Sequence, residues 1–295
     1  MARLFGTDGV RGVAGSELTI DMAMKIGSSA AYVLTKNKKE VKVIIGNDGR
    51  ESSYMLVAAL KAGLYSFGVS VLDAGLLPTP AISYLVKYYK MDAGIMVTAS
   101  HNSYEYNGIK IFDSNGYKLP DEIEDEIEKY VREGYKYQVN KMGRPLESRN
   151  FVEDYGNYLL DCLYKYNPNT DFSNLNIVID TANGASSNTS SYIFSKLGCK
   201  YHIINNKPNG TNINNNCGSM HPEGLRQYIL ENKLDGGVLY DGDADRAIFI
   251  DEEGNIIDGD YVLAIIGTDL KKKNKLHNNT IVGTVMNNLG FINYC

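Results

Sequence analysis

The chain has 295 residues, of which 43% are hydrophobic and 22% charged, and its formal net charge is −5. At about 100–200 residues per domain, this length predicts about two globular domains, and the composition excludes a disordered or fibrous protein. The net acidity and the lack of long basic runs argue against a general binder of nucleic acid or anionic membranes. An anionic ligand would therefore need a few placed cations or a metal ion.

The cysteines and the N-terminus indicate the cellular compartment. Cys162, Cys199, Cys217 and Cys295 lie far apart, and no pair has the CxxC spacing. This usage favours a reducing compartment over a disulfide scaffold or a cysteine-rich zinc site. The N-terminus lacks an apolar stretch of signal-peptide length, and no segment approaches the ~20 apolar residues of a transmembrane helix. We therefore expect a cytoplasmic protein without a membrane partner.

Predicted strands and helices alternate from residue 41 to residue 100. The strands are apolar runs at 41–46, 69–72 and 94–97, and the segments with helical spacing are 51–67 and 80–89. This order predicts right-handed βαβ units and a mostly parallel sheet. In such sheets, ligands bind beyond the carboxyl ends of the strands. Ser100 and His101 lie at one of these ends.

The next segment combines β-structure with an acidic helix. Residues 107–112 and 117–119 are short β-like runs on either side of Asn115-Gly116, a dipeptide that is typical of hairpin turns. Residues 121–132 carry many acidic side chains on one face and an apolar stripe on the other, which predicts a helix with a solvated face. Residues 134–150 have no periodicity, so we expect a domain boundary there.

A second alternating block follows, and a third begins. Its predicted elements are a helix at 151–166, strands at 176–180, 200–204 and 236–240, helices at 186–197 and 222–232, an Asn-rich loop at 205–216, and a hairpin within 247–257. A helix at 261–271 and a strand at 280–285 come next. Because a lone βα unit cannot bury its own faces, this third block looks unfinished. We therefore expect domains at 1–150 and 151–255, and the start of an incomplete third α/β domain at 256–295.

Three aspartates alternate directly after the predicted strand at 236–240. Asp241, Asp243 and Asp245 would converge on one side of an extended segment and repel one another, which a hard divalent cation would relieve. An EF-hand is excluded because Arg246 occupies the position that needs glycine. A solvated acidic turn is the alternative. We favour a metal loop, with open positions of the kind that Mg²⁺ fills with phosphate oxygens.

Other candidate residues lie near the predicted strand ends. Ser100 does not stand in the G-x-S-x-G elbow of hydrolases, so a serine near a magnesium loop favours phosphoryl transfer. Lys110 could act as a general base or acid if its neighbours depress its pKa, and an exposed strand lysine is an equal alternative. Arg11 lies in the glycine-rich segment 6–12 and suits phosphate recognition, unless that segment is an ordinary N-terminal loop.

These motifs together resemble the α-D-phosphohexomutase family. The carrying segments are Phe5-Gly6-Thr7-Asp8-Gly9-Val10-Arg11-Gly12, residues 98–102 with Asn107-Gly108-Ile109-Lys110, and residues 241–246, in the family's order and spacing. The first segment and residues 216–223 resemble its bacterial phosphoglucosamine mutase branch. The resemblance covers essentially the whole chain and implies repeated αβ domains with mixed, mostly parallel sheets.

The resemblance also implies an active site. Ser100 would be the phosphoserine, in a catalytic domain at 1–150, and would hold Mg²⁺ together with Asp241, Asp243 and Asp245 of the metal-binding domain. His101, Lys110 and Arg11 match further active-site positions, with Lys110 as general base. Arg11, Lys110 and Arg246 would bind phosphate. The list of implied site residues is thus Ser100, His101, Lys110, Arg11, Arg246, Asp241, Asp243 and Asp245.

The implied reaction interconverts glucosamine 6-phosphate and glucosamine 1-phosphate for UDP-N-acetylglucosamine and cell-wall precursor synthesis, with glucosamine 1,6-bisphosphate as intermediate and activator. Ser103 stands where the family commonly has proline, and the family's sugar-reading loop and fourth domain lie beyond this sequence. Two alternatives therefore remain: a phosphomannomutase or phosphoglucomutase, and a truncated magnesium-binding fragment with little turnover. A homo-oligomer and a complementing C-terminal fragment are both open as partner arrangements beside the phosphosugar substrate.

Overall fold

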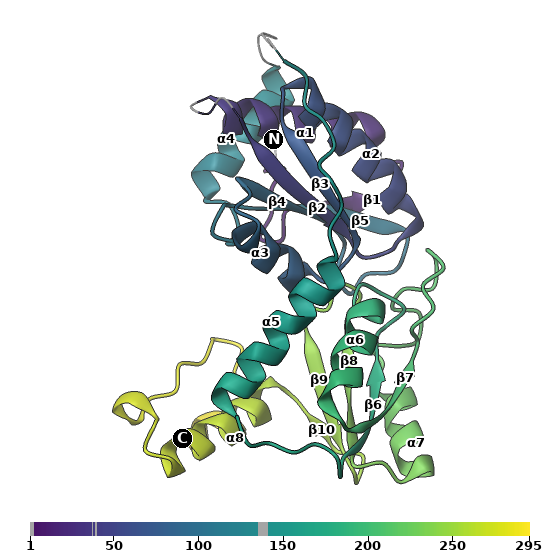
Figure 1. Ribbon diagram of the computed structural model, residues 1–295, viewed down its shortest axis with the longest axis vertical. Coiled ribbons are helices and arrows are strands. Elements are labelled where there is room, and N and C mark those ends of the chain that lie inside the picture. Colours follow the sequence, from purple (N-terminus) through teal and green to yellow (C-terminus); the bar gives the residue numbers. More distant parts are fainter. Residues whose placement is uncertain (1–2, 37, 39, 135–140) are drawn as a thin grey trace.

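The computed structural model describes residues 3–36, 38, 40–134 and 141–295. Figure 1 shows two α/β units stacked along the long axis of the molecule, with the long helix α5 (Phe151–Tyr166) running between them. Of the expected boundary segment 134–150, residues 135–140 lie outside the described part of the chain. Residues 141–150 extend along the first unit, where Pro145 forms a bridge with Val71.

The first unit is a five-stranded mixed sheet in the order β1-β5-β4-β2-β3. Its strands are β1 (Val10–Val13), β2 (Lys42–Asn47), β3 (Ser70–Leu76), β4 (Ala93–Val97) and β5 (Tyr106–Phe112). The strands β3, β2 and β4 are parallel, and β5 is antiparallel to both of its neighbours, β4 and β1. The parallel core and the predicted strand positions are confirmed, and β1 is an addition that the sequence pattern did not predict.

Helices cover both faces of this sheet. One face is covered by α1 (Ile20–Thr35), α2 (Glu51–Ser66) and α4 (Asp121–Glu133), and the other by α3 (Thr79–Tyr88) with the start of α5. The side chains of β2 alternate accordingly, since Val43 and Ile45 lie in the first core and Ile44 lies in the second. The Asn115-Gly116 turn also forms, closed by one antiparallel bridge between Phe112 and Lys118.

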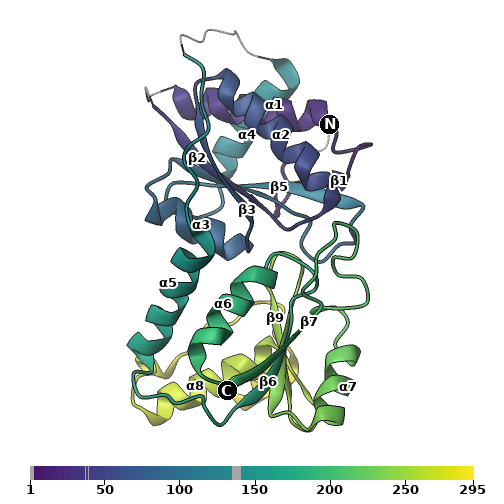
Figure 2. The same ribbon diagram turned by 45° about the vertical axis from the view of Figure 1, so that its right-hand side comes forward.

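The second unit repeats the plan of the first. Its sheet has the order β10-β9-β8-β6-β7, with β6 (Asn176–Asp180), β7 (Lys200–Ile204), β8 (Gly236–Tyr240), β9 (Ala247–Asp251) and β10 (Ile256–Ile257). Strands β7, β6 and β8 are parallel, and β9 is antiparallel to β8 and β10. Strand β8 therefore occupies the place in the second sheet that β4 occupies in the first. The helices α6 (Ser187–Leu197) and α7 (Glu223–Asn232) lie on its two faces (Figure 2).

The boundary between the second and third expected domains shifts slightly. Ile256 and Ile257 pair with Ile250 and Phe249 of β9, so they belong to the second sheet and not to the expected third block at 256–295. The helix α5 also contributes to both units, since Phe151 and Tyr155 lie in the core under α3 while the helix packs against α6.

The segment after the second sheet differs from the sequence prediction. Helix α8 (Gly259–Lys272) is present, followed by a short 3₁₀ helix η1 (His277–Asn279) and α9 (Leu289–Tyr294). The predicted strand at 280–285 was wrong, because residues 280–285 are irregular. A β-like run needs a neighbouring strand to satisfy its backbone groups, and the described residues offer this segment none. Within the described part of the chain, no helix is long and apolar enough to cross a membrane.

Candidate active site

The two units meet at the carboxyl ends of β4 and β8. Strand β4 is buried along its whole length and leads into the segment Thr98–Asn102, while β8 leads into the aspartate loop 241–246. Because β4 and β8 occupy equivalent places in the two sheets, the same end of each unit supplies one half of the site. The sequence predicted polar residues at both strand ends, and the structure brings them together across the interface between the units.

Ser100 lies at the centre of this interface. Its side chain is 1% exposed, and its Oγ donates a 2.6 Å hydrogen bond to Oδ2 of Asp241. Gly242 allows the two loops to approach this closely, because a Cβ there would lie 2.7 Å from the Ser100 carbonyl oxygen. The backbone of Ser100 has φ of +54°, a left-handed conformation that serine adopts at some energetic cost.

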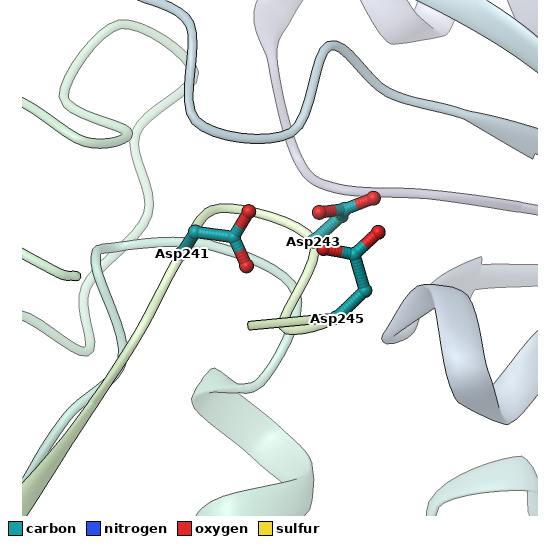
Figure 3. A group of neighbouring side chains, drawn as sticks. All are labelled: Asp241, Asp243 and Asp245. Carbon is teal, nitrogen blue, oxygen red and sulfur yellow. The ribbon is translucent and has the colours of Figure 1, made fainter. Parts of the chain in front are cut away.

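The three aspartates form one carboxylate cluster. One oxygen from each of Asp241, Asp243 and Asp245 lies within 4.8 Å of the others, and Figure 3 shows the three carboxylates drawn together around the turn. Asp241 and Asp243 are fully buried, and Asp245 is exposed. Among the described residues, Oδ1 of Asp243 is buried without a hydrogen-bond donor. A buried, unpaired carboxylate oxygen in a set of oxygen ligands fits a hard divalent cation such as Mg²⁺.

Burial and mutual repulsion set the charge state of this cluster. Burial, followed by the charge of Asp243, raises the pKa of Asp241 to about 7. Burial alone would also raise the pKa of Asp243, but the Lys110 ammonium and hydrogen bonds from Lys110 and Thr79 lower it below its usual range. The cluster therefore gathers negative charge. Among the described residues, Lys110 is the one cationic side chain within hydrogen-bonding distance of it, and it compensates this charge only in part.

Lys110 reaches the cluster from β5 of the first unit. Its Nζ lies 2.8 Å from Oδ2 of Asp243 and 3.2 Å from Oδ2 of Asp245. Burial would lower the pKa of Lys110, but the two carboxylates raise it above its usual value. Without a cation on the carboxylates, the shift is opposite in direction to the depressed pKa that a general-base role needs, and that role stays a prediction. In this arrangement Lys110 is a charged hydrogen-bond donor.

His101, Arg11 and Arg246 are more exposed than Ser100 and the two buried aspartates. Nδ1 of His101 lies 3.1 Å from NH1 of Arg246, whose backbone amide donates to Oδ1 of Asp241. Burial and the charges of Arg246 and Arg11 lower the pKa of His101. Arg11 lies on β1 beside Gly108, its NH2 is 3.4 Å from Asp8, and among the described residues its Nε is buried without an acceptor. Such an unpaired guanidinium nitrogen suits an anionic ligand.

Thr79 is a contributor that sequence reasoning missed. At the start of α3, its amide donates to the carbonyl oxygen of Asp243 at 2.9 Å, and its Oγ1 donates to Oδ2 of Asp243 at 2.6 Å. The first unit thus orients a carboxylate of the second unit through both its backbone and its side chain. The only local signal is a threonine between two prolines, Pro78 and Pro80, at a helix start.

Comparison with known proteins places this site in a family. The model for phosphoglucomutase/phosphomannomutase, alpha/beta/alpha domain I, matches residues 2–138, and the model for domain II matches residues 153–254. The two matches cover most of the chain and include both loops of the site. The chain belongs to the phosphoglucomutase/phosphomannomutase family, the α-D-phosphohexomutases.

Curated relatives refine the comparison. The chain is 49% identical over 294 residues to the phosphoglucosamine mutase of Thermoanaerobacter sp. strain X514, covering 99% of this chain and 65% of the relative. It is 48% identical over 295 residues to the phosphoglucosamine mutase of Clostridium botulinum strain Hall, covering 98% of this chain and 65% of the relative. The chain therefore spans about two thirds of the length of these relatives.

A solved structure from the same family has the same fold. The phosphoglucomutase/phosphomannomutase family protein of Burkholderia thailandensis is 25% identical, with a TM-score of 0.75, over 92% of this chain and 59% of that protein. The family and fold class that the sequence motifs predicted are thereby confirmed.

Proposed function

We propose that this chain carries the phosphoryl-transfer chemistry of a phosphoglucosamine mutase, which interconverts glucosamine 6-phosphate and glucosamine 1-phosphate. The observation that supports this proposal best is the 2.6 Å contact between Ser100 Oγ and Asp241 inside the aspartate cluster. A serine hydroxyl that lies against prospective metal ligands is placed to exchange a phosphoryl group. The relatives at 48–49% identity, which are named phosphoglucosamine mutases, favour this sugar over mannose or glucose.

The geometry supports a role for each residue of the cluster. Ser100 would accept and return the phosphoryl group, and Asp241, Asp243 and Asp245 would hold Mg²⁺ together with an oxygen of the phosphorylated serine. When bound, Mg²⁺ would neutralise charge on the transferring phosphoryl oxygens. In the forward step, a sugar hydroxyl oxygen bonds to phosphorus as the bond between phosphorus and Ser100 Oγ breaks, and the sugar hydroxyl proton ends on Ser100 Oγ, which regains its hydroxyl. Loading of Ser100 from glucosamine 1,6-bisphosphate is the reverse exchange.

The cationic residues would act on the phosphate. Lys110, charged and 11% exposed, would donate to phosphoryl oxygens, and the more exposed Arg11 and Arg246 would also bind phosphate. Burial and the neighbouring arginines lower the pKa of His101, so we assign it a hydrogen-bonding role at the site rather than a cationic one. We divide the chain into a phosphoserine domain at 1–150 and a metal-binding domain that ends after Ile257.

The proposal is tested by loading the serine. The purified chain is incubated in three separate reactions, each containing Mg²⁺ and the 1,6-bisphosphate of glucosamine, glucose or mannose. The products are then analysed by intact mass and peptide mapping. We expect one phosphoryl group on Ser100, loaded fastest by the glucosamine compound, and none in Ser100→Ala. Ser103→Ala is the matched control, because Ser103 is exposed three residues away and should load normally. Phosphate elsewhere, or none, would refute the proposal.

A further inference from the structure

The loop that carries Ser100 is built around one buried arginine. Arg50 precedes α2, is 0% exposed, and donates through all five of its N–H groups. NH2 donates to the carbonyl oxygens of Ser100 and Asn102, each at 2.9 Å. NH1 donates to the carbonyl oxygens of Ser103 and Tyr106, and Nε donates to Asp48. One rigid guanidinium plane therefore fixes four carbonyls along residues 100–106.

The same arginine reaches Ser100 by a second route. Asp48 is also 0% exposed, and its Oδ2 lies 2.8 Å from Nε of Arg50, which balances the buried charge. That oxygen also accepts a 2.7 Å hydrogen bond from Oγ1 of Thr98, and Thr98 Oγ1 accepts the amide of Ser100 at 2.8 Å. Both the amide and the carbonyl of Ser100 are thus tied to Arg50, which supports its left-handed backbone.

A residue of the second unit holds the loop from the other side. Asn214 lies in the Asn-rich loop 205–216, and its Nδ2 donates to the carbonyl oxygens of Ser100 at 2.8 Å and Asn102 at 3.0 Å. These are the two carbonyls that NH2 of Arg50 also binds, so both acceptor positions of each oxygen are occupied. Asn214 is buried, and its backbone N–H donates to the carbonyl oxygen of Ala182 in the second unit at 3.0 Å.

We propose that Arg50 and Asn214 are positioning residues that clamp the phosphoacceptor loop from the two units. Arg50 sets the shape of the loop, and Asn214 keeps that shape in register with the aspartate cluster of its own unit. The contact between the side chains of Ser100 and Asp241 then depends on Arg50 and Asn214, which bind the backbone of the loop and neither of those two side chains. This inference rests on the proposed function, because it concerns the geometry from which Ser100 would accept phosphate.

The test compares variants at Asn214 with a matched neighbour. Asn214→Gly removes both donors and tolerates the φ of +57°, and Asn214→Asp keeps the side-chain shape while replacing the donor by an acceptor. Asn216→Gly is the control, because Asn216 is exposed and has a similar φ of +53° two residues along the loop. Arg50→Lys tests the contribution of the first unit to the clamp, since lysine has three N–H donors in place of the five of arginine.

Two readouts are made on each variant that shows a cooperative thermal transition. Amide hydrogen exchange of peptides covering residues 98–107 reports the loop, and the rate of Ser100 phosphorylation at saturating bisphosphate reports positioning. For both Asn214 variants we expect faster exchange in that loop and phosphorylation slower by about 30-fold, the effect of two hydrogen bonds of ordinary strength. The bisphosphate concentration for half-maximal rate should stay within about twofold, because the clamp does not touch the ligand.

The outcomes separate this inference from the proposed function. Unchanged loop exchange and unchanged phosphorylation in Asn214→Gly would overturn the clamp, as would equal effects from Asn216→Gly. A wild-type chain that takes no phosphate would overturn the proposed function, while faster loop exchange in the Asn214 variants would still support the clamp. Arg50→Lys is expected to slow phosphorylation by at least about 100-fold.

Discussion

Replacing Lys110 with methionine should destabilise the metal-free protein and strengthen its binding of Mg²⁺. Lys110 is 11% exposed and lies 2.8 Å from Oδ2 of Asp243, whose side chain is 0% exposed. Removing one partner of a buried ion pair costs about 3–5 kcal/mol. Because its second partner, Asp245, is 35% exposed, we expect the lower end, about 3 kcal/mol. For units of this size, that loss lowers the melting temperature by roughly 6–12 °C.

The metal dependence makes this prediction specific. Lys110 and a divalent cation compete for the same carboxylate oxygens, and two unit charges 4 Å apart interact by about 4 kcal/mol at an effective dielectric of ~20. Removing the ammonium should therefore tighten Mg²⁺ binding at least about tenfold, a change of about 1.4 kcal/mol. Melting curves across a Mg²⁺ titration, with isothermal calorimetry, measure both effects. Added Mg²⁺ should restore most of the stability that the variant loses.

Lys61→Met is the matched control. Lys61 also lies 2.8 Å from a carboxylate, that of Asp73, but the two side chains are 27% and 41% exposed. An exposed pair of this kind contributes about 0–1 kcal/mol, so its loss should be small and independent of Mg²⁺. Weaker Mg²⁺ binding in Lys110→Met, or equal destabilisation of the two variants at every Mg²⁺ concentration, would refute this reasoning.

Three further predictions concern the same site. Arg246→Ala should raise the pKa of His101, followed by NMR titration, yet leave it below 6.5 because burial is the larger cause of its depression; an unchanged pKa would remove Arg246 as a cause. Thr79→Val should weaken Mg²⁺ binding by about tenfold in calorimetry, because it removes a 2.6 Å hydrogen bond that orients Asp243; unaltered affinity would count against that orienting role. The folded-state pKa of Asp241 lies near 7, above its ordinary value of 3.8, so the stability that Asp241 contributes without Mg²⁺ should fall as pH rises from about 4 to 7, while the lowered pKa of His101 acts in the opposite direction. The stability of Asp241→Asn relative to the wild type should therefore increase over this range, and a difference that does not change with pH would contradict the prediction.

Much of the fold follows from local pattern. Strands β6, β7 and β8 have the bounds that the sequence predicted, and β9 lies within the predicted hairpin, because short runs between turn residues leave few alternatives. Helix α1 was not predicted, since its centre contains Gly27, Ser28 and Ser29, which have weak helix propensity. Its stability comes from packing on α2, where Gly27 and Gly63 let the two helices approach closely. That contact joins residues far apart in the sequence.

The candidate site also contains residues that local pattern predicts and residues that only the folded chain brings into place. Ser100 and the three aspartates follow strands directly, so their positions were predictable from local pattern and family motifs. The contributions of Arg50, Thr79 and Asn214 were not predictable, because each acts on a loop at least 50 residues away or in the other unit. The raised pKa of Lys110 has the same origin, since Asp243 reaches it only in the folded chain.

In the proposed reaction, Ser100 passes a phosphoryl group to and from an amino sugar. The most direct measurement isolates the chain phosphorylated on Ser100, adds glucosamine 6-phosphate with Mg²⁺, and follows the phosphate by peptide mapping and by analysis of the sugar. We predict that Ser100 loses its phosphate as glucosamine 1,6-bisphosphate appears in equal amount. Phosphate that stays on Ser100, or that is released to water as inorganic phosphate, would contradict the account.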